Sequence, residues 1–186
     1  MIRTGVLLAA GLVLAGSVHA EAFKLFSPDI KPQTPIADEQ VFAGLGCDGK
    51  NISPALKWSG APPGTKSFAL LVHDPDAPTG GAGWWHWVVT NIPAETAELP
   101  KGAGKADGSA LPKGARQINT DFGGPGWGGP CPPLGDKPHR YNFTLHALKV
   151  GKLDLRPGAT AALTGATVKA NSIGQATLTG RYGRSR

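Results

Sequence analysis

The sequence lacks the short motifs that mark several common catalytic sites. Its 186 residues contain no G-x-S-x-G, no H-E-x-x-H and no phosphate-binding loop of the G-x-x-x-x-G-K-[ST] type. These absences argue against a hydrolase with a nucleophile elbow, a zinc protease of that helical type and a P-loop nucleotidase. Ser53 and Ser59 lie in turn-like segments and have no evident base beside them.

Long apolar runs are also rare. The one clear run covers residues 6–15, after the positive charge of Arg3 and before the small residues that end at Ala20. This pattern predicts a signal peptide over residues 1–20, cleaved after Ala20, because a membrane-spanning helix needs about 20 apolar residues. We expect residues 21–186 to form a single domain that is periplasmic or secreted, without a stable membrane anchor. A native N-terminal strand or an uncleaved anchor is the alternative.

The chain has no run of lysine and arginine interleaved with aromatic residues, the pattern that is typical of nucleic-acid-binding surfaces. Its formal charge of +6 falls by one, to +5, when the predicted cleavage removes Arg3. Such a charge favours anionic partners only weakly, because the basic residues are scattered. The arginines of the GRYGRSR tail are expected to be solvated. We therefore predict no nucleic-acid partner.

Cysteine is scarce, and Cys47 and Cys131 are the two that occur. An isolated pair in an exported protein usually forms a disulfide. In the chain-entropy model a bridge across so long a loop stabilises the fold by about 4 kcal/mol. A two-cysteine zinc site is the alternative, but the spacing matches no ligand motif. We predict the disulfide, with no metal and no cofactor.

Glycine and proline, in contrast, are abundant, with 27 and 17 residues, and this indicates many turns and few long helices. Apolar and polar residues alternate over residues 140–150, which predicts a half-buried strand. The inward face of that strand would carry Tyr141, Phe143, Leu145 and Ala147. Further strands are predicted over residues 66–73, 86–92 and 175–183.

One segment, residues 160–173, has a helical pattern. Its expected buried face consists of Leu163, Ala166, Ala170 and Ile173, which recur at helical spacing. Gly174 follows as a plausible C-terminal stop. Residues 102–114 are polar and rich in glycine and lysine, and we expect a surface loop there. Together these patterns predict a mainly β domain with one or two short helices.

Two aspartates flank Pro75 at the end of the strand predicted over residues 66–73. Proline fixes its own φ and disfavours the helical region for Asp74. In an extended chain Asp74 and Asp76 would lie on the same side, so both carboxylates would point in one direction. Taken alone, Asp-Pro-Asp is also an ordinary turn sequence.

Histidines stand near two other strand ends: His86 follows Trp84, and His139 precedes Tyr141 after a Gly/Pro-rich stretch. If these ends converge, they form a site on a rigid scaffold. A histidine paired with aspartate stays protonated near neutral pH and donates to an anion, and amides of a Gly-rich turn add donors. The alternative is purely structural: hydrogen-bonded histidines at strand ends and tryptophans in the core.

The ordered motifs DPDAP, WHW and GPCPP…HRY.F closely resemble the phosphatidylethanolamine-binding protein family, also called Raf kinase inhibitor proteins. The stretch GCDGKNISPALKWSGAPPGTKSFALLVHDPDAPTG is similar to the bacterial YbhB/YbcL-type branch, particularly its secreted members. The resemblance runs from about Phe23 to the last predicted strand. It implies two packed β-sheets with one or two short peripheral helices, and a small anion pocket at one end.

The resemblance also implies the pocket residues. These are Asp74, Asp76, Pro78, His86, Pro133, His139 and Tyr141, with the backbone of residues 129–132 nearby. Family members bind phosphate, acetate or phosphoethanolamine-like groups there, and they tend to have cis bonds before the prolines that match Pro75 and Pro133. A Cys47–Cys131 bridge would then fix the pocket loop and preorganise its amide donors.

We predict a non-enzymatic binding protein whose partner is a small anion, either phosphate or a phosphorylated head group such as phosphoethanolamine. One alternative is a protein-interaction module that inhibits a protease or regulates another protein partner, which the sequence does not identify. The other is a metal-assisted hydrolase that uses His86 and His139 with Asp74 and Asp76. The stiffness of Asp-Pro-Asp argues against the hydrolase, since metal ligands usually need free orientation.

Overall fold

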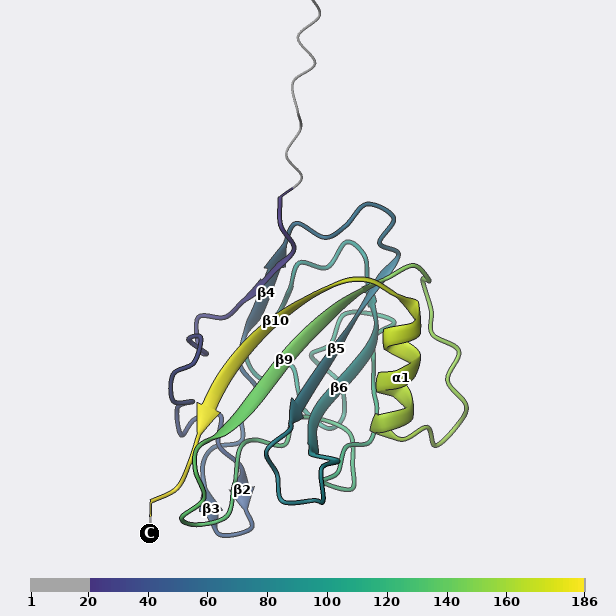
Figure 1. The fold of residues 1–186 in the computed structure, drawn as a ribbon. Helices are drawn as coiled ribbons and strands as arrows, with labels where there is room; N and C mark the ends of the chain where they lie inside the picture. The colour runs from purple at the N-terminus through teal and green to yellow at the C-terminus, as the bar shows by residue number, and fades with distance from the viewer. Residues whose placement is uncertain (1–20, 186) are drawn as a thin grey trace, which may run out of the picture.

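The computed structural model describes residues 21–185 (Figure 1). The signal peptide expected over residues 1–20 lies outside this range, so its cleavage after Ala20 stays a prediction. Within the described residues, no helix has both the length and the apolar character needed to cross a membrane. The elements are β1 (Lys24–Phe26), β2 (Ala43–Gly44), β3 (Cys47–Asp48), β4 (Leu56–Ser59), β5 (Ser67–Asp74), β6 (Trp84–Pro93), β7 (Glu98–Leu99), β8 (Arg116–Gln117), β9 (His139–Leu148), α1 (Ala161–Asn171) and β10 (Ser172–Tyr182).

The strands form one large and two small sheets. The large sheet has five strands in the order β10-β9-β5-β6-β8, and a second sheet has three strands in the order β1-β4-β7. All neighbours in both sheets are antiparallel. Strands β2 and β3 form a separate hairpin. The predicted mainly β architecture with a short helix is therefore confirmed, and the hairpin is an addition to it.

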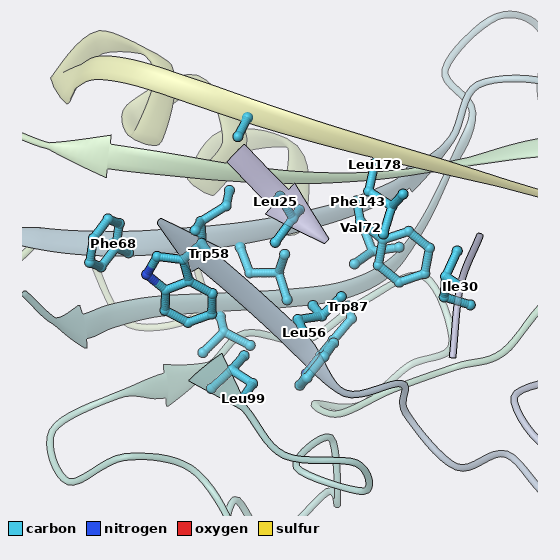
Figure 2. Packing of buried hydrophobic residues seen from close by; sticks show 14 of the residues in the cluster. Leu25, Ile30, Leu56, Trp58, Phe68, Val72, Trp87, Leu99, Phe143 and Leu178 are labelled. Atoms are coloured by element: carbon cyan, nitrogen blue, oxygen red, sulfur yellow. The ribbon is translucent and has the colours of Figure 1, made fainter. Parts of the chain in front are cut away.

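The main core lies between the five-stranded and three-stranded sheets (Figure 2). Side chains alternate across a strand, so β5 points Phe68 and Val72 into this core and Ala69 and Leu71 to the opposite face. On β9 the predicted inward residues Tyr141, Phe143, Leu145 and Ala147 are all fully buried. Truncating a core aromatic of this kind to alanine costs about 3–5 kcal/mol. Strands β5 and β6 are thus buried on both faces, which holds them rigidly.

Helix α1 covers the second face of the large sheet, as Figure 1 shows. It buries Ala161, Thr164, Gly165 and Val168, which recur at helical spacing. The face predicted from Leu163, Ala166, Ala170 and Ile173 is therefore wrong, and Leu163 and Ile173 are exposed. The reason is close packing, because a Cβ on Gly165 would lie 3.0 Å from the Trp85 ring. The small residues let the helix approach the sheet.

The end of the helix also differs from the prediction. The helix begins after Thr160, whose side chain accepts a hydrogen bond from the backbone of Leu163, and it ends at Asn171. The backbone N–H of Ser172 bonds the carbonyl of Lys169, and the chain then enters β10 at once. Gly174 is therefore a strand residue and does not terminate the helix.

The four predicted long strands are confirmed, and most of their ends lie within two residues of the predicted positions. The strand expected over residues 86–92 begins earlier, at Trp84, and the strand expected over 175–183 begins at Ser172. The loop predicted over 102–114 contains turns and no strand or helix. The short strands β1, β4, β7 and β8 were not predicted.

Candidate functional site

The antiparallel register brings three strand ends together. Strand β5 ends at Asp74, which pairs with Trp84 at the start of β6. Strand β9 begins at His139 and runs antiparallel to β5 on the other side, with His73 opposite Asn142. The C-terminal end of β5 therefore lies between the beginnings of β6 and β9. This is the convergence of strand ends that the sequence predicted.

A cavity of about 310 Å³ opens at these strand ends. Its polar lining comes from Asp74, His86, His139 and Tyr141, all of which are buried. Its remaining lining residues are Leu45, Ala77, Pro78, Thr79, Trp84, Phe122, Cys131, Pro132 and Pro133. The arrangement is a small polar floor surrounded by a mainly apolar rim, which suits a ligand with one polar group.

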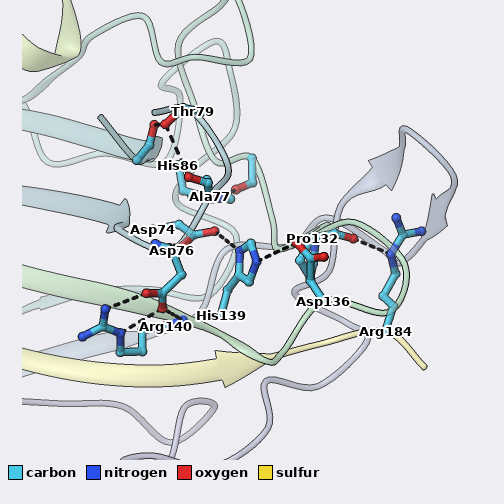
Figure 3. A network of polar contacts seen from close by, with 12 residues as sticks. Asp74, Asp76, Ala77, Thr79, His86, Pro132, Asp136, His139, Arg140 and Arg184 are labelled. Carbon is cyan, nitrogen blue, oxygen red and sulfur yellow. Dashed lines mark hydrogen bonds and ion pairs between the residues drawn. The ribbon is translucent and has the colours of Figure 1, made fainter. Parts of the chain in front are cut away.

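Asp74 and His139 form a buried pair at the floor, with a distance of 2.8 Å from Asp74 Oδ2 to His139 Nδ1. Because the carboxylate oxygen accepts, Nδ1 carries the proton. On the other side of the ring, His139 Nε2 lies 3.5 Å from Asp136 Oδ2. Figure 3 shows this chain of contacts running from Asp74 through His139 to Asp136. The pair fixes the orientation of the His139 ring.

His86 is buried and bonds the backbone instead of a carboxylate. Its Nδ1 donates to the Gly128 carbonyl at 2.6 Å. Burial lowers the pKa of His86 to about 4, although the Gly128 carbonyl and the charge of Asp74 oppose the shift. The expectation of a cationic imidazole does not hold for His86, because desolvation outweighs its partners.

Tyr141 lies beside His86, with 5.0 Å between the ring centroids. Burial raises the pKa of the Tyr141 hydroxyl well above its usual range, and the negative charge of Asp74 adds to this. The hydroxyl therefore keeps its proton and is available as a hydrogen-bond donor.

Asp76 does not line the cavity. Its carboxylate accepts from the side chain of Arg140 at 2.8 and 2.6 Å and from the Arg140 backbone N–H at 2.9 Å. The Arg140 guanidinium is the main reason that the pKa of Asp76 falls to about 2. The two carboxylates diverge because the chain turns at Pro75, so the extended geometry that would align them is absent.

The prolines at the site are not cis. All peptide bonds of the described residues are trans, so the expected cis bonds before Pro75 and Pro133 are wrong. With a trans bond the Asp76 N–H donates to Asp74 Oδ1 at 2.8 Å, which closes the turn. At the second position the Pro132 carbonyl accepts from Arg184 at 2.7 Å.

The loop at residues 128–133 has few free amides, contrary to expectation. The Gly128 N–H donates to the carbonyl of His86 at 2.9 Å, and the Gly129 N–H donates to Asn51 Oδ1 at 2.8 Å. The prolines at 130, 132 and 133 have no N–H. Within the described residues, Cys131 has the one backbone donor of this loop without a hydrogen-bond partner.

The predicted disulfide is confirmed, and it joins the wall of the cavity to the β2–β3 hairpin. Cys47 and Cys131 are bonded, with 6.0 Å between their Cα atoms. Arg184 makes a second connection, since its side chain donates to the carbonyls of Pro132 and Gly46, each at 2.7 Å. These links hold the hairpin tip, where the Leu45 side chain lines the cavity, against the rim.

Several residues at the cavity were not predicted from the sequence. Leu45, Phe122 and Thr79 line the cavity, and Asn51 braces the loop behind it. The sequence places Leu45 beside Cys47, so the predicted disulfide was a signal that this hairpin approaches the pocket loop. Nothing local in the sequence marks Phe122 or Asn51.

Among residues 21–185, no three His, Cys, Asp or Glu side chains gather in a way that could hold a metal ion.

Comparisons with known proteins agree with this architecture. A family model described as phosphatidylethanolamine-binding protein matches residues 27–183. The YbcL protein of Escherichia coli is 51% identical over 166 residues, covering 89% of this chain and 90% of YbcL. Its crystal structure, described as that of a new member of the mammalian PEBP family, matches with a TM-score of 0.84 over 87% of this chain and 98% of that one.

Two other relatives extend the comparison. The YbhB protein of Escherichia coli is 46% identical over 159 residues, which are 86% of this chain and 99% of YbhB. A Mycobacterium tuberculosis protein described as the putative lipoprotein LppC is 37% identical over 163 residues, covering 88% of this chain and 73% of that protein.

Proposed function

Since the chain belongs to the phosphatidylethanolamine-binding protein family, we propose that it is a non-catalytic binding protein whose cavity holds phosphate or a phosphorylated head group such as phosphoethanolamine. Family membership supports the binding role. The observation that carries the choice of ligand is the small cavity at the strand ends, with a buried polar floor under an apolar rim. Its volume of about 310 Å³ is near the lower limit of ligand pockets.

The floor offers polar groups that are buried and held in fixed orientations. The protonated Tyr141 hydroxyl provides a hydrogen-bond donor for an oxyanion oxygen. His139, whose Nδ1 donates to Asp74, adds a donor at Nε2 when its ring carries a second proton. The rim, with Trp84, Phe122 and Leu45, suits the apolar or uncharged remainder of a ligand. Hydrogen bonds to charged groups contribute about 1.5–3 kcal/mol each, which is enough for a small anion to bind.

We also propose that the protein works outside the cytoplasm, in the periplasm or after secretion. The Cys47–Cys131 disulfide supports this location, because such bonds persist in oxidising compartments. The similarity to LppC, described as a putative lipoprotein, points the same way. Disulfide status and fractionation of the native protein test this proposal, and recovery of the reduced protein from the cytoplasm would contradict it.

The binding proposal is tested by calorimetry with phosphate and phosphoethanolamine. We expect His139→Ala and Asp74→Ala each to weaken phosphate binding by at least about 1–3 kcal/mol, the range for a lost charge-assisted hydrogen bond. The first variant removes the ring itself, and the second removes the carboxylate that orients the ring. His139→Gln keeps a polar side chain and is a second variant in case His139→Ala fails to fold. Thermal unfolding of every variant verifies that it is folded. His146→Gln is the matched control, because His146 is buried elsewhere on β9. Native affinity in both cavity variants would remove the assignment.

A further inference from the structure

The position of the proton on His86 is set by the backbone. The Gly128 carbonyl can only accept, so His86 Nδ1 must be the protonated nitrogen of the neutral ring. Nε2 points away from Gly128 and has no hydrogen-bond partner among residues 21–185, and the ring lines the cavity. The neutral His86 therefore presents a lone pair, which is an acceptor, to a ligand.

The loop that holds this tautomer is itself braced. The Gly128 N–H returns a hydrogen bond to the His86 carbonyl at 2.9 Å. Asn51 spans the loop, since its Oδ1 accepts from Gly129 at 2.8 Å and its Nδ2 donates to the Trp127 carbonyl at 3.1 Å. The Gly128 carbonyl cannot turn away without breaking these bonds, so the acceptor character of Nε2 is built into the fold.

Asp74 is the second acceptor at the floor. Each of its oxygens already accepts one hydrogen bond, from Asp76 N–H and from His139 Nδ1, and a carboxylate has capacity for more. A fully deprotonated oxyanion would place its oxygens against these two acceptors. A ligand that carries an acidic hydroxyl avoids this conflict, because the hydroxyl donates.

We propose that the cavity selects oxyanions that carry an acidic proton, namely hydrogen phosphate and phosphate monoesters, over sulfate and phosphate diesters. The P–OH group donates to His86 Nε2, and another oxygen of the anion accepts from the Tyr141 hydroxyl. The inference rests on the proposed function, because it assumes that the oxyanion binds in this cavity.

The charges around His86 leave the neutral ring in place. Strand β5 contributes the negative charge of Asp74 and the imidazole of His73, and the segment after β8 contributes Asp121. Strand β9 contributes His139 and the hydroxyl of Tyr141. Burial dominates these contributions and holds the pKa of His86 at about 4. At pH 6 His86 Nε2 therefore carries no proton, and the ligand P–OH supplies the proton for the hydrogen bond between them.

The test compares methyl phosphate with dimethyl phosphate at pH 6 by calorimetry. About half of a phosphate monoester carries its acidic proton at this pH, whereas a diester has none to give. We expect methyl phosphate to bind about tenfold or more tightly than dimethyl phosphate or sulfate, the penalty of one unmatched buried group. Raising the pH to 8, which deprotonates the monoester, should weaken its binding.

A substitution at His86 links the selectivity to this ring. His86→Gln places a side-chain amide near the position of Nε2, and an amide can either donate or accept. We expect the preference for methyl phosphate over sulfate to shrink in this variant. His146→Gln makes the same change at a buried histidine outside the cavity and should leave the preference intact.

The outcomes separate the two proposals. Equal binding of the monoester, the diester and sulfate to the native protein would overturn the selectivity and leave the anion site standing. A preference that persists unchanged in His86→Gln would also overturn it. Failure of all three anions to bind would contradict the proposed function, and the selectivity would fall with it.

Discussion

His86 and His146 are two buried histidines on the same five-stranded sheet, and burial is the main reason that the pKa of each falls to about 4. Each has one engaged nitrogen: His86 Nδ1 bonds the Gly128 carbonyl at 2.6 Å, and His146 Nδ1 lies 3.1 Å from Ser172 Oγ. By burial and pKa alone the two histidines cannot be told apart.

Their surroundings differ. His86 lines the cavity at the strand ends, whereas His146 lies near the other end of β9, where it is paired with Ala69 of β5 and does not line that cavity. A strongly shifted pKa therefore marks a functional group only when an unengaged atom also faces a space that a ligand can enter. In this sheet His86 meets that condition.

The largest expected effect is on the pH dependence of stability, to which His86 and His146 should contribute equally. Because the folded pKa of each is about 4 and the ordinary value is 6.5, the unfolded chain takes up protons first as the pH falls. Their contribution to the free energy of unfolding is present above pH 6.5 and is lost toward pH 4. Between pH 7 and 5 we expect a loss of about 2 kcal/mol from each, about 4 kcal/mol together. Urea unfolding across this range measures it.

Two substitutions separate the contributions. His86→Gln and His146→Gln should each remove about half of the pH-dependent loss. Saturating phosphate should reduce the pH-dependent loss in the native protein and in His146→Gln, but have a smaller effect in His86→Gln. A pH profile that is identical in the native protein and in both variants would show that other groups cause the loss.

The disulfide supports the end of the sheet that carries the cavity and His86, and it does not support the end that carries His146. Replacing Cys47 and Cys131 with serine removes a link between residues separated by 84 positions. We expect the free energy of unfolding to fall by about 2–4 kcal/mol and phosphate binding to weaken, since Leu45 and the cavity wall lose their connection. Unchanged stability and affinity in this variant or in the reduced native protein would contradict the bracing role.

The helix-covered face should respond in the opposite way, with a change in stability but not in ligand binding. In Gly165→Val the new side chain would meet the Trp85 ring, which lies 3.0 Å from the position of a Cβ. We expect a loss of about 1–3 kcal/mol from overpacking and unchanged phosphate affinity. Ala162→Val, at an exposed position of the same helix, is the control for helix propensity. A loss of affinity in Gly165→Val would mean that the two regions are coupled.

The sequence predicted the strand ends well because their signals are local. Alternation in β9, the proline after Asp74 and the glycine-rich turns each depend on neighbouring residues. Antiparallel pairing then places Asp74, His86 and His139 together without further information. The disulfide followed from the cysteine content and the predicted compartment. These features need only the chain and the period of a strand.

The missed features depend on residues far away in the sequence. The buried face of α1 is set by close contact between Gly165 and Trp85, and hydrophobicity alone favoured Leu163. Asp76 diverges from Asp74 at the turn after Pro75, and Arg140 holds its carboxylate there across 64 positions of sequence. The proton on His86 depends on the Gly128 carbonyl and on burial, neither of which is visible in the segment around Trp84 and Trp85.

The smallest expected effect concerns Arg184, which braces the cavity rim without lining the cavity. Its side chain joins the carbonyls of Pro132 and Gly46, so Arg184→Met removes the polar link between the pocket loop and the hairpin while the disulfide remains. We expect a loss of stability of about 1 kcal/mol or less, since the carbonyls can bond water instead, and a few-fold loss of phosphate affinity. Arg181→Met is the matched control, because Arg181 bonds Gln33 at 2.9 Å, away from the rim. If both variants lowered affinity equally, the effect would come from the loss of positive charge, and the position of the hairpin would not control binding.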